Sequence, residues 1–118
     1  MIKDQKITDT YAVYNADCMH VLPTLEKDSV DLSIYSPPFA GLYNYSSSPN
    51  DFSNCATREE FLQQYEFLIK EMSRITKPGR LSVVHVEEII NQNGSNWDFP
   101  HAVIELHEKY GFHYKNRI

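Results

Sequence analysis

Four consecutive residues, Ser36-Pro37-Pro38-Phe39, have the clearest chemical potential in the sequence. Two successive prolines hold the backbone at φ of about −65°. The Ser36 hydroxyl and the Pro37 carbonyl are therefore expected to converge as hydrogen-bond acceptors, with the Phe39 ring beside them. Two acceptors next to an aromatic face suit a planar amine, such as the exocyclic amino group of a nucleobase.

Such an amino group is a poor nucleophile because its lone pair is delocalised. Two acceptors bonded to its hydrogens favour a pyramidal nitrogen whose lone pair points at an electrophile, so the protein acts mainly by positioning. Phe39 is the candidate for stacking on a base turned out of the duplex, with Tyr43 and Tyr45 as helpers. The alternatives are a polyproline-type turn for the motif and packing against another part of the protein for the two tyrosines.

A predicted strand places this motif. Residues 30–35 alternate apolar and polar side chains, so Val30, Leu32 and Ile34 share one face. The prolines that follow must end the strand because they carry no N–H donor. Ser36 is therefore expected at the carboxyl end of a strand, where open α/β sheets bind their ligands.

The flanking segments predict an α/β domain. Upstream, residues 11–14 predict a strand, and Asp17 predicts the cap of a short helix that Pro23 strains. Downstream, the sequence predicts a helix over residues 57–75 that opens with a capping box and stops at Pro78-Gly79. A buried strand over residues 81–86 and a polar loop over residues 91–96 are expected next. The last predicted elements are a helix opened by Asp98 and closed by Gly111, and a final strand from Phe112. Strands alternating with helices favour a small, mainly parallel sheet with helices on its faces.

Two further segments are interpreted from their polarity. The helix over residues 57–75 has an apolar stripe that predicts a core face, and we interpret its opposite charges as a solvated face: Glu59, Glu66, Lys70 and Arg74. Residues 40–56 contain a cluster of turn-forming residues and are expected to form a mobile loop.

Composition limits the class of protein. With 118 residues, 42% of them hydrophobic, the chain can bury the core of one domain. A formal charge of −5 has the wrong sign for a stand-alone nucleic-acid binder, so any grip on DNA must be local or supplied elsewhere. The cysteines and histidines lack metal-binding spacing, so no metal is predicted. No apolar run resembles a signal peptide or membrane span, which favours a cytoplasmic protein.

Several segments occur in the order found in a known family: Asn15-Ala16-Asp17-Cys18, then Asp28-Ser29-Val30-Asp31-Leu32 running into Ser36-Pro37-Pro38-Phe39, then Thr76-Lys77-Pro78-Gly79 before Leu81-Ser82-Val83-Val84. Together they resemble the N-terminal catalytic half of the β-class DNA amino-methyltransferases of bacterial and phage restriction-modification systems. The family motif is Asp, Asn or Ser followed by Pro-Pro and an aromatic residue. A first Ser is similar chiefly to the cytosine-N4 enzymes. The resemblance covers about residues 12–118 and implies a partial Rossmann-like methyltransferase fold.

The resemblance also implies roles for individual residues. S-adenosylmethionine is implied as methyl donor and double-stranded DNA as substrate of the full-length enzyme. Ser36 and the Pro37 carbonyl would hold the target amine. Pro38 completes the motif, and Phe39 would stack on the base. Asp17 would contact the adenosine part of the cofactor; helix capping is the alternative, and one carboxylate can do both.

Parts of the family pattern are missing. The sequence has no aromatic-x-Gly-x-Gly cofactor signature, because its glycines stand at positions 41, 79, 94 and 111. Ala16 replaces a usual Gly, Arg80 stands where a second Gly is common, and no target-recognition region follows the motif. We therefore expect residues 1–118 to be a truncated catalytic portion, ending within a strand at Ile118, that is inactive alone.

The target base and the role of the chain stay open at this stage. The base is cytosine N4 or, alternatively, adenine N6. The chain is an enzyme portion or a non-catalytic piece, such as one half of a split protein. In the second case it would bind a C-terminal half, or associate with itself, through an exposed sheet edge.

Overall fold

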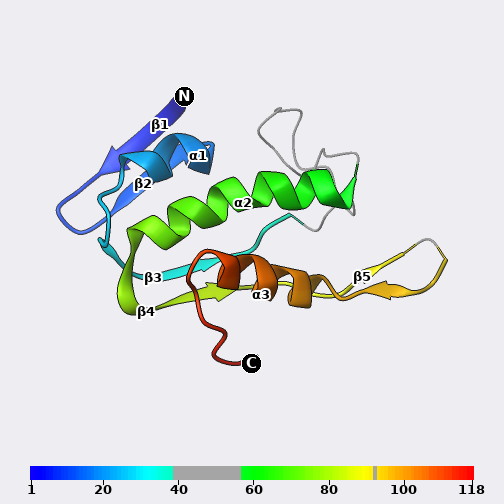
Figure 1. The fold of residues 1–118 in the computed structure, drawn as a ribbon. Coiled ribbons are helices and arrows are strands. Elements are labelled where there is room, and N and C mark those ends of the chain that lie inside the picture. The colour runs from blue at the N-terminus through cyan, green and yellow to red at the C-terminus, as the bar shows by residue number, and fades with distance from the viewer. Residues whose placement is uncertain (39–56, 92) are drawn as a thin grey trace.

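The computed structural model describes residues 1–38, 57–91 and 93–118. Figure 1 shows the elements in chain order: β1 (Ile2–Ile7), β2 (Ala12–Ala16), α1 (Cys18–Val21), the 3-10 helix η1 (Leu22–Thr24), β3 (Val30–Tyr35), α2 (Arg58–Ile75), β4 (Thr76–Val84), β5 (Ile89–Ile90), β6 (Asn96–Trp97) and α3 (Phe99–Lys109). This mixture of strands and helices agrees with the predicted α/β class. The expected mobile loop over residues 40–56 lies outside the described residues.

The N-terminal strands form an antiparallel hairpin. β2 confirms the strand predicted over residues 11–14, and Ile7 lies opposite Ala12 at the closed end. The Thr8 hydroxyl accepts hydrogen bonds from the amides of Thr10 and Tyr11, which stabilises the turn. β1 was not predicted. All six of its residues are exposed, so it has no buried face for a hydrophobic pattern to mark.

β3 and β4 form the parallel pair that carries the motif. Leu32 lies opposite Leu81, Ile34 opposite Val83, and Tyr35 opposite Val84. The β1–β2 and β5–β6 pairs are antiparallel. The prediction of a mainly parallel sheet is therefore only partly confirmed, because parallel pairing in the described part of the chain is confined to β3 and β4.

α2 begins as predicted. The Thr57 side chain accepts a hydrogen bond from the Glu60 amide at 3.1 Å, as expected for an N-cap. Glu59 and Glu60 lie in the first turn, where negative charge is stabilised by the helix dipole. The predicted apolar stripe is buried: Phe61, Tyr65, Leu68, Met72 and Ile75, joined by Ile69.

α2 ends at Ile75, but Pro78-Gly79 does not stop it. Thr76 adopts an extended conformation, and its hydroxyl donates to the Met72 carbonyl at 2.6 Å, which caps the helix. β4 begins at Thr76 rather than at residue 81, so Pro78 and Gly79 lie inside a strand. Gly79 has φ of +77°, and the pairing with β3 shifts register nearby, which accommodates them.

The segment after β4 forms the hairpin β5–β6, which the sequence predicted only as a polar loop. Its pairing is short, with Ile89 opposite Trp97. α3 follows as predicted. The Asp98 carboxylate accepts from the His101 amide at 3.1 Å, and Gly111 with φ of +95° follows its last turn.

The predicted final strand from Phe112 is wrong, because residues 112–118 form no strand. The Phe112 amide donates to the His107 carbonyl at 3.1 Å, and the Gly111 amide donates to the Glu108 carbonyl at the same distance. The backbone that strand pairing would need is thus used to cap α3. No helix within residues 1–38, 57–91 and 93–118 is both long and apolar enough to cross a membrane.

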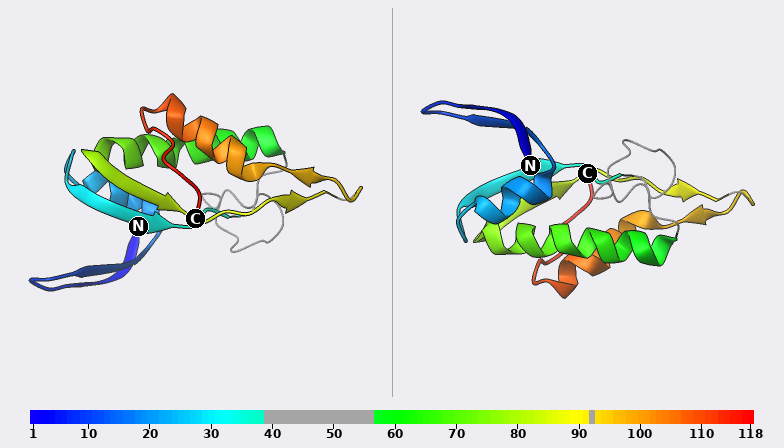
Figure 2. Two further views of the ribbon diagram at one scale, coloured as in Figure 1. Left: turned by 90° about the horizontal axis from the view of Figure 1, so that it is seen from below. Right: turned by 90° about the horizontal axis from the view of Figure 1, so that it is seen from above.

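The core lies on one side of the β3–β4 pair, where α2 and α3 pack together (Figure 2). Tyr65, Ile69 and Phe99 are fully buried there. The opposite face is open: Leu32 is 53%, Ile34 72%, Leu81 49% and Val83 39% exposed. The prediction of a buried strand over residues 81–86 is therefore wrong for the side chains of this face. The predicted alternation of side chains along β3 is confirmed, but the pattern did not indicate which face of the strand the helices cover.

Candidate functional site

The Ser36-Pro37-Pro38 segment lies at the carboxyl end of β3, as predicted. Two hydrogen bonds tie it to the residue after β4: the His85 amide donates to the Tyr35 carbonyl at 2.9 Å, and the Ser36 hydroxyl donates to the His85 carbonyl at 3.0 Å. Pro37 is buried, whereas Ser36 is exposed. The motif is therefore anchored to both parallel strands, and Ser36 is nevertheless exposed to solvent.

The two predicted acceptors do converge. The Ser36 Oγ atom lies 3.4 Å from the Pro37 carbonyl oxygen. An amino nitrogen placed about 2.9 Å from both oxygens would make N–H···O angles of roughly 145° if planar and roughly 155° if pyramidal. Because hydrogen bonds prefer the straighter geometry, this spacing favours the pyramidal form. The pair of oxygens can therefore orient an amine for attack.

A buried polar network lies behind the motif. The Tyr35 hydroxyl is 2.7 Å from the Tyr65 hydroxyl and 3.2 Å from His107 Nε2. His107 Nδ1 lies 2.7 Å from the Val103 carbonyl oxygen. A carbonyl can only accept, so Nδ1 carries the hydrogen and Nε2 accepts from Tyr35. Tyr65 then donates to Tyr35, so each of these three side-chain hydrogen bonds has a defined donor and acceptor.

Burial keeps this network uncharged. Desolvation raises the pKa of Tyr35 and, more strongly, that of Tyr65 above the usual tyrosine range. Desolvation also lowers the pKa of His107. Sequence reasoning did not identify this network. Three polar residues at inward positions could have indicated it. Tyr35 lies on the face of β3 opposite to that of Ile34, and Tyr65 and His107 lie on the inward faces of their helices.

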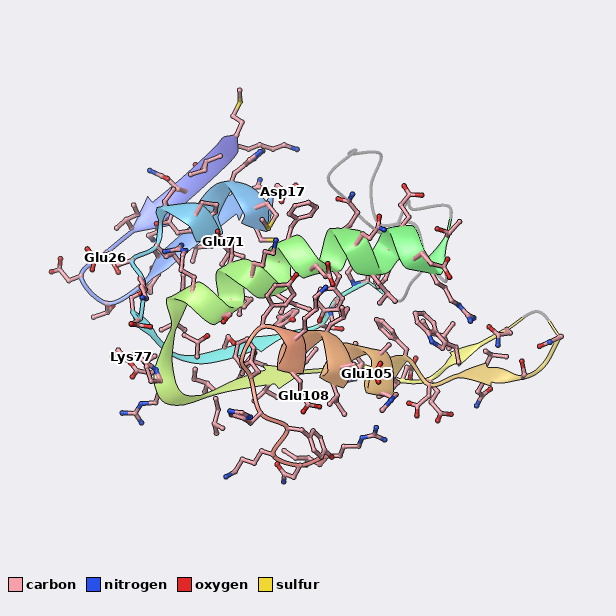
Figure 3. The ribbon with its side chains drawn as sticks, in the orientation of Figure 1. Asp17, Glu26, Glu71, Lys77, Glu105 and Glu108 are labelled. Carbon is pink, nitrogen blue, oxygen red and sulfur yellow. The ribbon has the colours of Figure 1, made fainter. Side chains whose placement is uncertain are left out.

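Asp17 is positioned as a helix cap. Its carboxylate accepts from the Met19 amide at 2.8 Å, which confirms the capping role. The side chain is half-buried at the carboxyl end of β2, near the start of α1 (Figure 3). No hydrogen bond joins Asp17 to Ser36.

The three aromatic candidates Phe39, Tyr43 and Tyr45 lie outside the described residues, so their roles stay predictions. For a cofactor, the half-buried Asp17 carboxylate fits a hydrogen bond with a hydroxyl or amino group of adenosine.

None of the described glycines forms a strand-to-helix turn: Gly79 is in β4, Gly94 in the β5–β6 turn and Gly111 after α3. Among the described residues, no group of three or more His, Cys, Asp or Glu side chains is placed to hold a metal ion.

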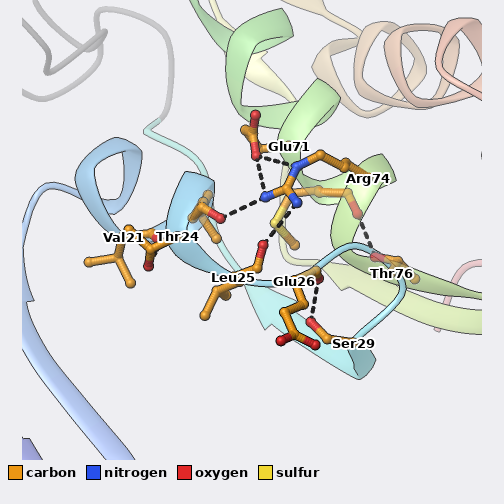
Figure 4. A network of polar contacts seen from close by, with 10 residues as sticks. Val21, Thr24, Leu25, Glu26, Ser29, Glu71, Arg74 and Thr76 are labelled. Carbon is orange, nitrogen blue, oxygen red and sulfur yellow. Dashed lines mark hydrogen bonds and ion pairs between the residues drawn. The ribbon is translucent and has the colours of Figure 1, made fainter.

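Arg74 holds the segment that follows α1 against α2. Its guanidinium donates to the carbonyls of Leu22 at 2.9 Å and Leu25 at 2.8 Å and pairs with Glu71 at 2.8 Å (Figure 4). Glu66 likewise binds Lys109 at 2.7 Å. Glu59 and Lys70 are exposed, as expected of the solvated face, whereas Glu66 and Arg74 are only partly exposed and each takes part in an ion pair.

The backbone of α2 makes a second attachment to this segment. The Asp28 amide donates to the Arg74 carbonyl at 3.0 Å, and the Ser29 amide donates to the Ile75 carbonyl at 2.8 Å. Two of the carbonyls that a helix end normally leaves unpaired are thereby satisfied. Since Val30 begins β3, these bonds fix the start of the strand that carries the motif.

Comparison with known proteins supports the predicted resemblance. No family model matches the chain. Over 106 residues, 90% of this chain, it is 29% identical to the type II methyltransferase M.BglII of Bacillus subtilis, of which it covers 28%. The similarity confirms the resemblance to a DNA methyltransferase that the motif order predicted.

The fold is also similar to crystal structures of TTHA0409, a protein assigned as a DNA modification methylase in Thermus thermophilus. A selenomethionine derivative matches with a TM-score of 0.67 at 22% identity, covering 85% of this chain and 38% of that chain. The complex of the same protein with S-adenosyl-L-methionine matches with a TM-score of 0.62 at 22% identity, covering 82% and 39%. The chain therefore spans less than two fifths of the length of either relative.

Proposed function

We propose that this chain is the target-amine portion of a DNA methyltransferase that transfers a methyl group from S-adenosylmethionine to an exocyclic base amine, cytosine N4. The observation that carries the proposal is the pair of oxygens from Ser36 and Pro37, 3.4 Å apart at the carboxyl end of β3. The similarity to M.BglII over most of this chain supports it.

The residues of the chain act by holding the substrate amine. Each of the two oxygens accepts one amine hydrogen, which withdraws the lone pair from conjugation and points it away from the protein backbone. The bound cofactor supplies an electrophilic methyl carbon, and sulfur keeps the bonding electrons when the methyl group leaves. The amine nitrogen forms the new N–C bond with its lone pair, and one N–H proton then passes to water.

The aromatic residues of the motif and the following segment complete the proposal. Phe39 stacks on the base after it leaves the duplex, and Tyr43 and Tyr45 contribute further contacts. The DNA duplex is the partner of the whole enzyme. A net charge of −5 supports this division, because this portion supplies few of the cations that phosphate binding requires.

The cofactor site needs more than this chain. Asp17 offers one carboxylate, and the sequence has no glycine-rich cofactor signature. We propose that a second, C-terminal half supplies the remaining contacts and that residues 1–118 alone do not methylate DNA.

Isothermal calorimetry tests this division of the cofactor site. We expect no binding of S-adenosylmethionine to the chain alone and measurable binding after a cofactor-binding half is added as a second polypeptide. Tight binding by the chain alone would contradict an incomplete site. If neither sample binds cofactor or methylates DNA, the chain is a non-catalytic piece.

The target base is tested with duplexes in which either cytosine or adenine carries the only available amine at a candidate site. Mass spectrometry of the nucleosides then identifies the product. N4-methylcytosine is expected, whereas N6-methyladenine would replace the cytosine assignment by the adenine alternative while leaving the reaction class intact.

The two roles of Asp17 can be separated by a matched pair of substitutions. Asp17→Asn keeps a capping acceptor and should change the free energy of unfolding by less than about 0.5 kcal/mol, whereas Asp17→Ala should cost about 1 kcal/mol. Both should weaken cofactor binding in the two-part assembly. If Asp17→Asn binds cofactor as well as the unchanged chain, a charged contact to the cofactor is excluded.

A further inference from the structure

Tyr35 is the last residue of β3, and hydrogen bonds hold both its backbone and its side chain. Its carbonyl accepts from the His85 amide at 2.9 Å. Its hydroxyl lies 2.7 Å from the Tyr65 hydroxyl and 3.2 Å from His107 Nε2. The backbone is therefore tied to the residue after β4, whereas the side chain is tied to α2 and α3.

These two attachments restrain the end of β3 in different directions. β4 pairs with one edge of β3, and no strand in the described part of the chain pairs with the other edge. Tyr35 packs instead against the core on the face that the helices cover. A bond at the backbone alone leaves the end of the strand free to tilt about it. A second bond at the far end of a rigid ring removes this freedom.

The hydroxyl groups give this restraint a single preferred geometry. The rings of Tyr35 and Tyr65 meet edge to face, with centroids 6.5 Å apart, and those of Tyr65 and His107 do so at 6.0 Å. Apolar ring contacts tolerate small displacements, but a buried hydroxyl that loses its partner becomes a costly desolvated polar group. Among the described residues, every buried side-chain nitrogen or oxygen has a hydrogen-bond partner. The network therefore favours one position of the Tyr35 side chain.

The position of the two target-amine oxygens depends on where β3 ends, because Ser36 and Pro37 follow Tyr35 directly. A misplacement of about 1 Å can cost about 100-fold in rate. We propose that Tyr35 is a positioning residue that fixes these oxygens through its hydroxyl bonds to Tyr65 and His107. The inference rests on the proposed function and adds residues that do not touch the substrate. It requires of the side chain at position 36 only that it accept a hydrogen bond.

Removal of single hydroxyl groups tests this role in the assembly with the cofactor-binding half. Tyr35→Phe should lower kcat of methyl transfer about 10- to 100-fold and leave KM for DNA within about 3-fold of its original value. Tyr65→Phe should lower kcat less, because the Tyr35 hydroxyl keeps its bond to His107. The double variant should be no slower than Tyr35→Phe, because both substitutions act on one network.

Two control variants separate positioning from a general loss of stability. Tyr11→Phe removes a hydroxyl from an exposed tyrosine, and Ile69→Val removes a methyl group from the same core without removing a hydrogen bond. Both should leave kcat unchanged. A loss in Ile69→Val as large as that in Tyr35→Phe would overturn the positioning role. Unchanged kcat in Tyr35→Phe would also overturn it and leave the proposed function standing.

A second readout needs neither cofactor nor DNA. ¹⁵N relaxation of the 118-residue chain measures the order parameter of the Ser36 amide, which is about 0.85 in rigid backbone. This value should fall toward about 0.6 in Tyr35→Phe and stay unchanged in Tyr11→Phe and Ile69→Val. The Val30 amide, at the other end of β3, should keep its value in all three variants.

The two readouts distinguish failure of the inference from failure of the proposed function. An unchanged Ser36 order parameter in Tyr35→Phe would overturn the inference. If the unchanged assembly never transfers a methyl group while Ser36 becomes mobile in Tyr35→Phe, the proposed function fails and Tyr35 remains the residue that fixes the end of β3.

Discussion

At the scale of single residues, the direction of each hydrogen bond determines what the motif and its support can do. Tyr65 donates to Tyr35, Tyr35 donates to His107, and His107 donates to the Val103 carbonyl. The chain of bonds requires His107 to be neutral, because a protonated imidazole would carry a second hydrogen against the Tyr35 hydroxyl.

His107 should therefore make stability depend on pH. Burial lowers its pKa in the folded state, so below about pH 6.5 the unfolded chain binds more protons than the folded one. The contribution of neutral His107 to the free energy of unfolding is fully present above that pH, and it is lost as pH falls toward the lowered pKa. Urea denaturation of the unchanged chain and of His107→Gln, compared at several pH values, measures it.

The variant should be less stable at neutral pH, and its loss relative to the unchanged chain should shrink as the solution is acidified. A constant difference from about pH 7.5 to about pH 5 would show that His107 does not titrate in this window. The comparison of two chains removes the contributions of the other histidines, which both contain.

At the scale of elements, the helices were predictable because local chemistry marks their ends. Thr57 and Asp98 cap α2 and α3, and the spacing of Phe61, Tyr65 and Leu68 marks the buried stripe. α2 ends just before Thr76, whose side chain donates a hydrogen bond to the Met72 carbonyl in the preceding turn. The sequence prediction placed the stop at Pro78-Gly79 instead, because proline and glycine are the stronger helix-ending signals.

Strands were harder to predict because their positions depend on distant partners. β1 has no apolar face, and residues 112–118 have suitable side chains but form no pairing. For the candidate site, the sequence placed Ser36 and Pro37 correctly through the end of β3. It did not indicate His85, because that residue contributes backbone atoms whose role depends on the pairing of β3 with β4.

Arg74 provides a test of how α2 holds the segment before β3. Replacing it by Ala removes hydrogen bonds to two carbonyls and an ion pair whose side chains are about one quarter to one third exposed. Because solvent screens the ion pair, we expect a loss of about 1–2 kcal/mol from the hydrogen bonds. Gln64→Ala, an exposed position of the same helix, should cost less than about 0.5 kcal/mol. Similar losses in both variants, measured by denaturation, would contradict the anchoring role.

At the scale of the whole molecule, one layer of helices covers a parallel pair whose other face is open. The radius of gyration is 15.2 Å, larger than the value of about 13.5 Å expected for a compact domain of this length. Figure 2 shows the β1–β2 and β5–β6 hairpins extending away from the helices. Parallel strands are normally covered on both faces, so this arrangement leaves apolar side chains in water.

The same substitution on the two faces should therefore have different effects. Ile34→Thr on the open face should change the free energy of unfolding by less than about 0.5 kcal/mol. Ile69→Thr in the core should cost about 2–4 kcal/mol, because it leaves a cavity and buries a hydroxyl. Denaturation curves measure both. An equally large loss for Ile34→Thr would show that the open face is covered in solution.

The bonds from Asp28 and Ser29 to the last carbonyls of α2 have a consequence for the dynamics of the chain. Amide protons in a connecting segment usually exchange rapidly with deuterium, but these two can exchange only when the end of α2 opens. Their protection factors should match those of the last helical turn and fall together with them in Arg74→Ala. The connection between α1 and β3 would then belong to the same cooperative unfolding unit as the helix, so the strand bearing Ser36 keeps its position as long as α2 is intact.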